Sequence, residues 1–322
     1  MKNMTVLGEG AWGTAIATLL AHNGYTVKLW CHDASLVHTI ANTRVNERYL
    51  PGVMLSSLIE PTSSLQEALS FSEFLFETTP VPFLRSIVTK AKPFVDESQI
   101  WVILSKGIEQ ESLFLPSVII DDVLGYIPHK AVISGPSFAR DLAQHMCTGV
   151  ALAATQENIA QRLSLMLGNH YFKTHETHDM TGVQLGGALK NCIAVGVGIL
   201  HGAECGDNTK ALLATRGFNE IVTLGQALGA HQETMYGLAG IGDLMLTAFG
   251  KYSKNVAVGI MLGQGQNIDM SPTSVLPEGI KTIKSVYHLI QRHELDLPIL
   301  HGIYQMVFED KSVKQFLHEL MQ

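Results

Sequence analysis

Cysteine is scarce in this sequence. Four cysteines are spread over 322 residues, and they form neither a Cys-x-x-Cys pair nor a Cys/His spacing typical of a metal site. The spacing therefore supports no disulfide framework and no metal centre, and it favours structural thiols in a reducing compartment. The four residues are Cys31, Cys147, Cys192 and Cys205.

Positive charge is also in short supply. Lysine and arginine total 22 against 29 acidic residues, which leaves a formal net charge of -7. This balance argues against a surface that binds polyanions, and nucleic acid is not expected as a partner. A local cationic pocket for a small phosphate remains compatible with the total.

A long uninterrupted apolar run is missing as well. The most apolar segment, 183–200, carries Lys190 and Asn191 at its centre, so we predict a buried helix and no membrane insertion. The N-terminus lacks the apolar core and cleavage site of a signal peptide, which favours a cytoplasmic location. The sequence has no Pro/Gly/Ser-rich linker, and its length suggests two domains that share a ligand-binding cleft.

The first half alternates short runs rich in Val, Ile, Leu and Phe with amphipathic stretches of helix length. This rhythm predicts an α/β fold with a doubly wound parallel sheet. Predicted helices include 13–22, 83–91 and 113–123. The predicted strands are 4–7, 26–30, 73–78, 100–104, 131–134, 150–153 and 171–173.

After about residue 179 the apolar spacing becomes helical throughout, which predicts an all-α C-terminal domain. We place the junction at 180–183, so that a dinucleotide-binding domain spans 1–182 and a helical substrate domain spans 183–322. The predicted helices of this second half are 183–203, 209–228, 253–262, 280–293 and 312–321.

A glycine motif follows the first predicted strand directly and opens the first predicted helix. In a Rossmann turn, Gly8 would permit the tight turn, Gly10 would let the backbone approach a pyrophosphate, and Gly13 would permit close packing of helix on sheet. The diphosphate would be held by the amides at the positive helix end. The alternative is a purely structural turn between strand and helix.

The tip of the second predicted strand reads Trp30-Cys31-His32-Asp33. Sites that prefer NAD usually place an acid at this tip, where it binds the ribose hydroxyls. No acid follows the strand immediately, whereas His32 could approach a 2′-phosphate, so we expect NADP(H), with NAD(H) tolerated. The alternative is an exposed loop histidine beside an Asp33 that caps the next helix.

Ligands of doubly wound sheets gather beyond the carboxyl ends of the strands, where two polar segments are expected. Lys106 follows one predicted strand, and Gly135, Ser137 and Ala139 follow the next. The amides near Ser137 suit a small oxyanion or a hydroxyl group. For Lys106, a solvated loop lysine is the alternative.

Lys190 is the most informative single residue, because it lies on a helix whose other residues are expected to be buried. Gly186 and Gly187 precede it on the same face and would leave room for a substrate. Partial desolvation lowers the pKa of an ammonium group towards neutrality. The alternative is a core lysine whose stem reaches the surface.

Two further features fall in the helical half. Asp243 lies in a glycine-rich segment, and Ser253-Lys254-Asn255 stands where a helix is expected to begin, with Ser253 as its N-cap. A helix N-terminus that carries hydroxyl, ammonium and amide groups is suited to a phosphate. Ordinary capping beside a solvated lysine is the alternative.

The sequence resembles the bacterial glycerol-3-phosphate dehydrogenase [NAD(P)+] family. The matching blocks, in order, are GEGAWGTA, LWCHD, SKGIE, VISGPSFA, GVQLGGALKN, GLAGIGDLMLT, KYSKN and PEGIKT. The resemblance implies a reversible reduction of dihydroxyacetone phosphate to sn-glycerol 3-phosphate for phospholipid synthesis, by a cytoplasmic homodimer. It also implies that Lys190 is the proton acceptor in the oxidative direction, with Lys106 and Asp243 beside the reacting groups.

The resemblance carries binding roles to individual positions. The implied cofactor-binding residues, for NADP(H) or NAD(H), are Gly8, Gly10, Ala11, Trp12, Gly13, His32, Lys106, Ala139, Lys254 and Glu278. The implied substrate-binding residues are Lys106, Gly135, Ser137, Lys190, Asp243, Ser253, Lys254 and Asn255.

Four positions depart from the family pattern. Ala11 stands where a residue with a hydroxyl group is usual. Lys254 stands where an arginine is usual, so an ammonium group with a single point of charge replaces a guanidinium that can form two parallel hydrogen bonds. Leu276 and Pro277 replace a Val-Val pair before Glu278. Weaker phosphate or cofactor binding is expected, with the reaction chemistry retained.

Two rival functions remain open from the sequence. A β-hydroxyacid dehydrogenase or ketopantoate reductase would need a cation for a carboxylate, whereas the Ser-Lys-Asn helix start suits a phosphate. A non-catalytic nucleotide sensor would need the glycine turn but neither Lys190 nor Asp243.

Overall fold

The computed structural model describes residues 3–271 and 276–322. The chain forms two compact units. The first, here called the sheet unit, comprises Met1–Ser105, Pro116–Ile133 and Ser137–Met180. The second, the helical unit, comprises Lys106–Leu115, Ser134–Pro136 and Thr181–Gln322. Two short segments that interrupt the sheet unit in sequence therefore belong to the helical unit.

The sheet unit is built on one eight-stranded sheet of order β10-β9-β8-β7-β6-β1-β2-β5. The pairs β1–β2, β1–β6, β2–β5, β6–β7, β7–β8 and β9–β10 are parallel. The strands are β1 (Asn3–Leu7), β2 (Thr26–Trp30), β5 (Ile59–Thr62), β6 (Phe74–Glu77), β7 (Ile100–Ile103), β8 (His129–Ser134), β9 (Thr148–Ala154) and β10 (Phe172–Thr177). Numbered among themselves, the first six strands follow the Rossmann order 3-2-1-4-5-6, so the predicted fold is confirmed.

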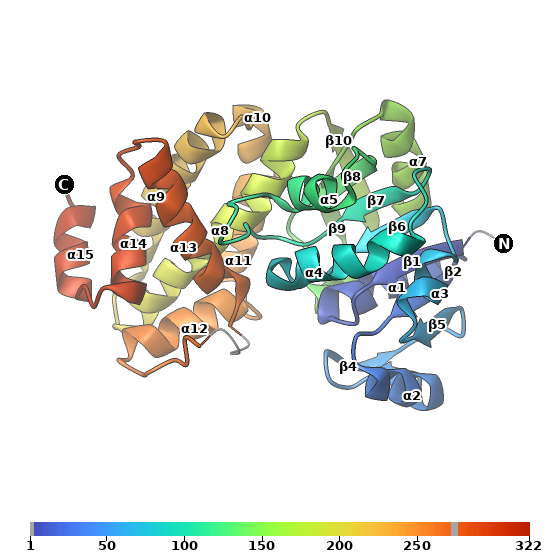
Figure 1. Cartoon of the computed structure of the whole chain (residues 1–322). Helices are drawn as coiled ribbons and strands as arrows, with labels where there is room; N and C mark the ends of the chain where they lie inside the picture. Colours follow the sequence, from blue (N-terminus) through green and yellow to red (C-terminus); the bar gives the residue numbers. More distant parts are fainter. Residues whose placement is uncertain (1–2, 272–275) are drawn as a thin grey trace. The chain divides into compact units, whose positions relative to one another are not determined.

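Helices connect these parallel strands, as crossovers require (Figure 1). They are α1 (Ala11–His22), α2 (Ala34–Thr43), α3 (Leu65–Leu69), α4 (Val81–Ala91), the 3-10 turn η1 (Lys92–Phe94), α5 (Pro116–Leu124), α6 (Ala139–Ala143) and α7 (Glu157–Leu167). The helix predicted from residue 113 begins instead at Pro116, because Leu113 has φ +63°, a left-handed conformation that a right-handed helix excludes.

All seven predicted strands are present, but the sequence pattern missed β5 and a small antiparallel hairpin of β3 (Val45–Asn46) and β4 (Leu50–Met54). Strand β5 reads Ile-Glu-Pro-Thr, in which proline and a charge obscure the apolar signal. Proline is tolerated there because β5 is the last strand in the sheet order and lies at its edge, next to β2.

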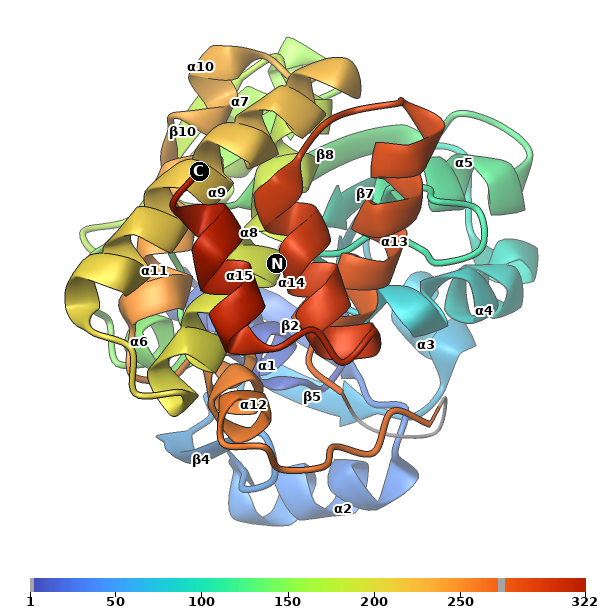
Figure 2. The same ribbon diagram turned by 90° about the vertical axis from the view of Figure 1, so that its left-hand side faces the viewer.

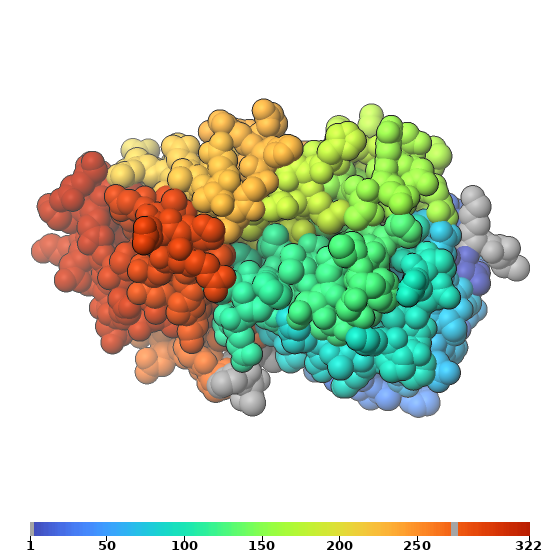
Figure 3. Space-filling model, turned by 45° about the horizontal axis from the view of Figure 1, so that its top comes forward, coloured from blue at the N-terminus to red at the C-terminus, as the bar shows by residue number. Residues whose placement is uncertain are grey.

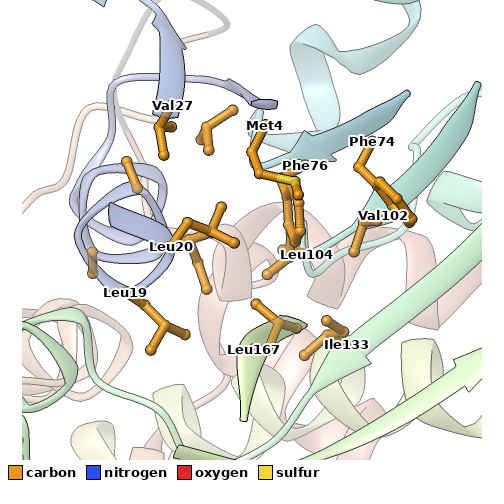
Figure 4. Close-up of a cluster of buried hydrophobic side chains, with 14 of the residues drawn as sticks. Met4, Leu19, Leu20, Val27, Phe74, Phe76, Val102, Leu104, Ile133 and Leu167 are labelled. Atoms are coloured by element: carbon orange, nitrogen blue, oxygen red, sulfur yellow. The ribbon is translucent and has the colours of Figure 1, made fainter. Parts of the chain in front are cut away.

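The core of the sheet unit lies between α1 and one face of the sheet. In Figure 4, Leu20 of α1 extends toward Phe76 of β6, and Leu19 and Val27 belong to the same buried cluster. Both Leu20 and Phe76 are fully buried, and burying one such side chain contributes roughly 1.5–3 kcal/mol. This packing fixes the start of α1 beside the end of β1.

The helical unit contains the predicted long helices and several short elements that periodicity missed. It comprises α8 (Met180–Gly202), α9 (Asp207–Ala227), α10 (Gln232–Met235), the π-helix η2 (Leu238–Gly242), α11 (Asp243–Phe249), α12 (Lys254–Gly263), α13 (Glu278–Arg292), α14 (Pro298–Phe308) and α15 (Val313–Leu320). Figure 2 shows α13, α14 and α15 side by side, and Figure 3 shows their orange-red and red residues as one continuous surface.

Helix α8 is the central element of the helical unit. Every residue from Gly182 to Leu200 is buried. Among the described residues, this is the one helix whose length and apolar composition would suit a membrane span, and the apolar window is fully buried inside the protein. Burial in the core of the helical unit explains the apolar composition of α8, and the predicted buried helix is confirmed.

Glycines bring α8 and α12 into backbone contact. A Cβ on Gly198 would lie 2.4 Å from the carbonyl oxygen of Val256, and a Cβ on Gly259 would lie 2.3 Å from that of Val195. No side chain fits at either position, so this crossing fixes the spacing of the two helices. Lys190 lies on α8 and Asn255 on α12, so their relative placement is fixed as well.

Candidate active site

The glycine turn between β1 and α1 has the geometry that a Rossmann motif needs. Gly8 has φ +121°, which L side chains rarely adopt. A Cβ on Gly13 would lie 2.0 Å from the carbonyl oxygen of Gly8 and 2.6 Å from Thr78 Oγ1, so only glycine fits there. A Cβ on Gly10 would meet nothing within 4 Å, so this part of the turn faces open space.

The start of α1 fits the diphosphate of a dinucleotide. Gly10 is the N-cap and supplies no side-chain cap, and the first turn contains no acid. Helix geometry leaves the first amides, including those of Ala11 and Trp12, without intrahelical acceptors, and the helix dipole favours an anion there. Trp12 Nε1 is a buried donor without a hydrogen-bond partner among the described residues. Open space, amides and an unused donor together fit a bound dinucleotide.

The tip of β2 carries an acid that the sequence pattern did not reveal. Glu9 accepts hydrogen bonds from the backbone N–H groups of His32, at 3.0 Å, and of Asp33, at 3.3 Å. The side chain of His32 is exposed, and Asp33 accepts from the backbone N–H of Ser35 as the N-cap of α2. An exposed histidine beside an aspartate that caps the next helix is the alternative drawn from the sequence, and both of these features are present in the loop.

A buried cluster in the helical unit brings together four residues that the sequence singled out. Lys190 of α8 donates a hydrogen bond to Asp243 Oδ1 at the start of α11. Lys106 donates to Asp243 Oδ2 at 2.5 Å and to the carbonyl oxygen of Gly135 at 3.2 Å. Lys190 also donates to Thr247 Oγ1 at 2.6 Å. One carboxylate therefore binds two ammonium groups.

Burial governs the electrostatics of this cluster. Asp243 is 1% exposed and Lys190 is 6% exposed. The pKa of Lys190 is lowered from 10.5 to about 7. Desolvation is the largest cause and the charge of Lys106 acts in the same direction, while the charge and hydrogen bond of Asp243 oppose the shift. Near neutral pH, Lys190 can therefore both give up and accept a proton.

The interpretation of Gly186 and Gly187 as room for a substrate is wrong. A Cβ on Gly186 would lie 2.5 Å from the carbonyl oxygen of Ala239, and one on Gly187 would lie 2.4 Å from Ser134 Oγ. The protein itself fills this space, because these glycines let η2 and the end of β8 approach α8. Ser134 Oγ is buried there without a hydrogen-bond partner among the described residues.

The start of α12 is capped as predicted. Ser253 Oγ accepts a hydrogen bond from the backbone N–H of Val256 at 3.2 Å, and Lys254 is exposed. The side chain of Asn255 donates to Asn191 Oδ1 and accepts from the backbone N–H of Gly279, both at 2.9 Å. Asn255 therefore joins α12 to α8 and to the start of α13, where Glu278 is the first residue.

The remaining predicted site residues lie in the sheet unit. Ser137 and Ala139 are both half-buried, and Ala139 is the first residue of α6. The residue before α6, Phe138, provides no side-chain cap for this short helix. Their roles remain predictions.

Two residues, one in the buried cluster and one at the tip of β2, escaped the sequence analysis for different reasons. Thr247 stands four residues after Asp243 on the same helix, and this i, i+4 spacing could have indicated that the two side chains lie on one face. Glu9 occupies a variable position of the glycine motif, and only the fold brings it to β2. Within the described residues, no group of three or more His, Cys, Asp or Glu side chains is arranged to hold a metal ion.

A second buried carboxyl group lies at the carboxyl end of β6. Glu77 is fully buried, and it accepts hydrogen bonds from the backbone N–H of Thr79 at 2.5 Å and from Ser105 Oγ at 2.6 Å. Burial raises the pKa of Glu77 to about 7, although both hydrogen bonds favour the charged form. This residue was not singled out from the sequence.

A Rossmann strand order, a glycine turn open to a dinucleotide and a buried lysine–carboxylate cluster define an NAD(P)-dependent oxidoreductase. Residues 3–160 match the NAD-dependent glycerol-3-phosphate dehydrogenase N-terminus, and residues 179–318 match the C-terminus of the same family. The chain belongs to the NAD-dependent glycerol-3-phosphate dehydrogenase family, and the resemblance noted in the sequence is confirmed.

Relatives match over nearly the whole chain. The glycerol-3-phosphate dehydrogenase [NAD(P)+] of Citrifermentans bemidjiense is 39% identical, covering 99% of this chain and 97% of the relative. That of Staphylococcus haemolyticus is 38% identical, covering 100% and 98%. The crystal structure of glycerol-3-phosphate dehydrogenase from Coxiella burnetii superposes with a TM-score of 0.93 at 32% identity, covering 100% and 99% of the two chains.

A more distant likeness separates fold from function. A ketopantoate reductase from Ralstonia eutropha JMP134 superposes with a TM-score of 0.63 at 12% identity, covering 99% of this chain and 100% of the other. At this identity the likeness concerns the fold alone. The rival assignment to that class therefore gains no support beyond a shared architecture.

Proposed function

We propose that this chain catalyses the reversible NAD(P)-dependent interconversion of dihydroxyacetone phosphate and sn-glycerol 3-phosphate, which supplies glycerophospholipid synthesis. Family membership supports this assignment, and the buried pair of Lys190 and Asp243 is the observation that carries it. A dehydrogenase acting on a ketone needs a group that can donate a proton to the developing alkoxide. Lys190, whose pKa is lowered to about 7 and which is paired with Asp243, suits this role.

In the proposed mechanism, the ammonium of Lys190 donates a proton to the C2 oxygen as that oxygen gains negative charge. In the oxidative direction, neutral Lys190 accepts the hydroxyl proton. Proton transfer from a positioned side chain is typically worth about 10²–10⁴-fold in rate. The bound dinucleotide supplies or accepts the hydride.

Asp243 and Lys106 have distinct proposed roles. Asp243 holds both ammonium groups, so it orients Lys190 and offsets part of the cost of burying its charge. Lys106 stays beside Asp243 after Lys190 has lost its proton and stabilises negative charge on the substrate. Thr247 accepts a hydrogen bond from Lys190 and restricts its direction.

The binding roles follow the family pattern. We propose that the turn of Gly8, Gly10, Ala11, Trp12 and Gly13 holds the diphosphate of NAD(H) or NADP(H). His32, Lys106, Ala139, Lys254 and Glu278 complete the proposed cofactor set. Gly135, Ser137, Ser253, Lys254 and Asn255 complete the proposed substrate set, in which the start of α12 receives the phosphate.

Domain roles, assembly and location are proposed on the same basis. Residues 1–182 form the dinucleotide-binding domain and residues 183–322 form the substrate domain, to which Lys106 and Gly135 contribute through their segments. A cytoplasmic homodimer is expected. Light scattering during size-exclusion chromatography measures the mass in solution, and a monomeric mass would contradict the dimer.

One assay tests the activity. NADH and NADPH oxidation is followed at 340 nm with dihydroxyacetone phosphate, with ketopantoate and with no substrate. We expect oxidation with the phosphorylated ketone only. Oxidation with ketopantoate alone would favour the rival reductase, and cofactor binding without any oxidation would favour a nucleotide sensor.

A further inference from the structure

The sheet unit carries a carboxylate at the tip of β2 that comes from the glycine turn. Glu9 stands between Gly8 and Gly10 and is 9% exposed. Strand β2 ends at Trp30 and is followed by Cys31. The carboxylate oxygens of Glu9 accept hydrogen bonds from the backbone amides of the next two residues, His32 and Asp33. The fold thus places an acid where the local sequence of β2 has none directly after the strand.

The backbone of Glu9 is held as firmly as its side chain. Its carbonyl oxygen accepts hydrogen bonds from Asn46 Nδ2, at 2.8 Å, and from Thr14 Oγ1, at 3.1 Å. Asn46 is fully buried and also donates to Thr14 Oγ1 at 2.8 Å. Contacts at both ends therefore fix the position of the carboxylate.

The hydrogen-bonding capacity and charge of the Glu9 carboxylate favour a ribose with two free hydroxyl groups over one that carries a 2′-phosphate. An ionised carboxylate only accepts hydrogen bonds and offers about four acceptor positions, of which the amides of His32 and Asp33 use two. The remaining positions suit the two hydroxyl groups of an adenosine ribose, which donate. A 2′-phosphate would bring a like charge against Glu9 and would find these amides already occupied.

The other charges near this tip do not offset Glu9. Arg48 forms an ion pair with Asp33 at 2.9 Å, so its charge is already balanced there. Hydrogen bonds from Ser35 and the charge of Arg48 lower the pKa of Asp33, so that pair stays ionised. Burial, together with the negative charges of Glu9 and Asp33, raises the pKa of the Cys31 thiol to about 12. The balance of charge at the tip is negative.

We propose that Glu9 is the specificity-determining residue for the cofactor and selects NAD(H) over NADP(H). Its carboxylate takes the part that an acid at the end of the second strand plays in other NAD-binding sheets. The preference for NADP(H) expected from the sequence rested on the apparent lack of such an acid. The proposal rests on the family's use of a nicotinamide dinucleotide and is independent of the substrate.

Binding measurements test this without turnover. Dissociation constants of NADH, NADPH, ADP-ribose and 2′-phospho-ADP-ribose are measured by calorimetry for the wild type, Glu9→Gln and Glu9→Ala. We expect the wild type to bind each non-phosphorylated ligand at least about tenfold more tightly than its phosphorylated counterpart. Glu9→Gln keeps an acceptor but removes the charge, so it should reduce this ratio about tenfold, mainly by tighter binding of the phosphorylated ligands.

The double variant Asp33→Asn/Arg48→Gln is the matched control, because it removes the neighbouring ion pair as a whole, leaves the charge of Glu9 in place and keeps a good N-cap for α2. We expect it to change the ratio by less than about threefold. A wild type that binds NADPH as tightly as NADH would overturn the proposal, and so would Glu9 variants with the wild-type ratio. A shift in the double control variant as large as that of Glu9→Gln would overturn it as well. The ADP-ribose ligands lack the nicotinamide, so these outcomes stay separate from failure of the proposed catalytic role.

Discussion

The ammonium of Lys190 lies 2.6 Å from the hydroxyl oxygen of Thr247, one helical turn beyond Asp243. Both side chains are buried, so this hydrogen bond forms away from water. A hydroxyl that accepts from an ammonium favours the charged form of the amine. Thr247 therefore helps to set the pH at which Lys190 loses its proton.

Replacing Thr247 with valine should lower the pKa of Lys190, because the charged form loses an acceptor. We expect the pH at which the reductive kcat falls to half to move down by about one unit. Thr247→Ser keeps the acceptor and should stay close to the wild type. The measurement is kcat against pH for all three proteins, and coincident profiles for valine and threonine would contradict the prediction.

Lys190→Met should bind cofactor normally and lose at least about two orders of magnitude in kcat. The variant should fold, because Asp243 keeps its second ion pair with Lys106. Calorimetric titration with NADH and a thermal melt serve as controls. Turnover near the wild-type value would show that Lys190 does not transfer the proton.

The two reaction directions should depend on pH with opposite signs. Lys190 has its pKa lowered to about 7, so it is protonated below that pH and neutral above it. Reduction needs the proton and should decline as the pH rises through about 7, whereas oxidation needs the neutral amine and should increase. Initial rates at saturating substrate, measured in both directions, check this. Parallel profiles would be incompatible with one group serving both directions.

Lys254→Arg should lower KM for the phosphorylated substrate more than it changes kcat. Lys254 is the first residue of α12 and is exposed, so the longer planar group can be accommodated. A guanidinium binds phosphate with two parallel hydrogen bonds, whereas an ammonium acts as a point charge. Steady-state kinetics with dihydroxyacetone phosphate provide the test, with Lys251→Arg on the preceding turn as the control. An unchanged or higher KM would count against a phosphate site at this helix start.

Glu77→Gln should stabilise the protein at neutral and alkaline pH but not at acidic pH. Burial raises the folded-state pKa of Glu77 from 4.5 to about 7. The stabilisation from the protonated form is fully present below about pH 4.5 and is lost as the pH rises through about 7. Urea unfolding should therefore show a gain for the variant of up to about 3 kcal/mol near pH 8 and almost none near pH 4.5. An equal effect at both pH values would contradict this.

The parts of this molecule that follow from local spacing could be predicted. The glycine turn, the parallel sheet and the buried helix that carries Lys190 follow from patterns within short segments. Strand β5 could not be recognised, because its stability comes from pairing with β2 and its own four residues include a glutamate and a proline. Short helices such as α10 contain too few residues for the helical spacing of apolar side chains to be recognised.

The contacts between distant segments were beyond the sequence. Gly186 and Gly187 carry no sign of what fills the space beside them, and the structure puts the Ala239 carbonyl and the Ser134 hydroxyl there. Glu9 and His32 are 23 residues apart, and only the parallel pairing of β1 with β2 brings them together. Such contacts depend on topology, which residue spacing alone does not encode.

The way the chain crosses between the sheet unit and the helical unit limits how the protein can be dissected. Lys106–Leu115 and Ser134–Pro136 belong to the helical unit, although both segments precede residue 181. A C-terminal fragment that begins at residue 183 would retain Lys190 and Asp243 but lack Lys106 and Gly135, and thus half of the ion pairs of Asp243. Expressing the two halves as separate polypeptides would therefore divide the lysine–carboxylate cluster itself.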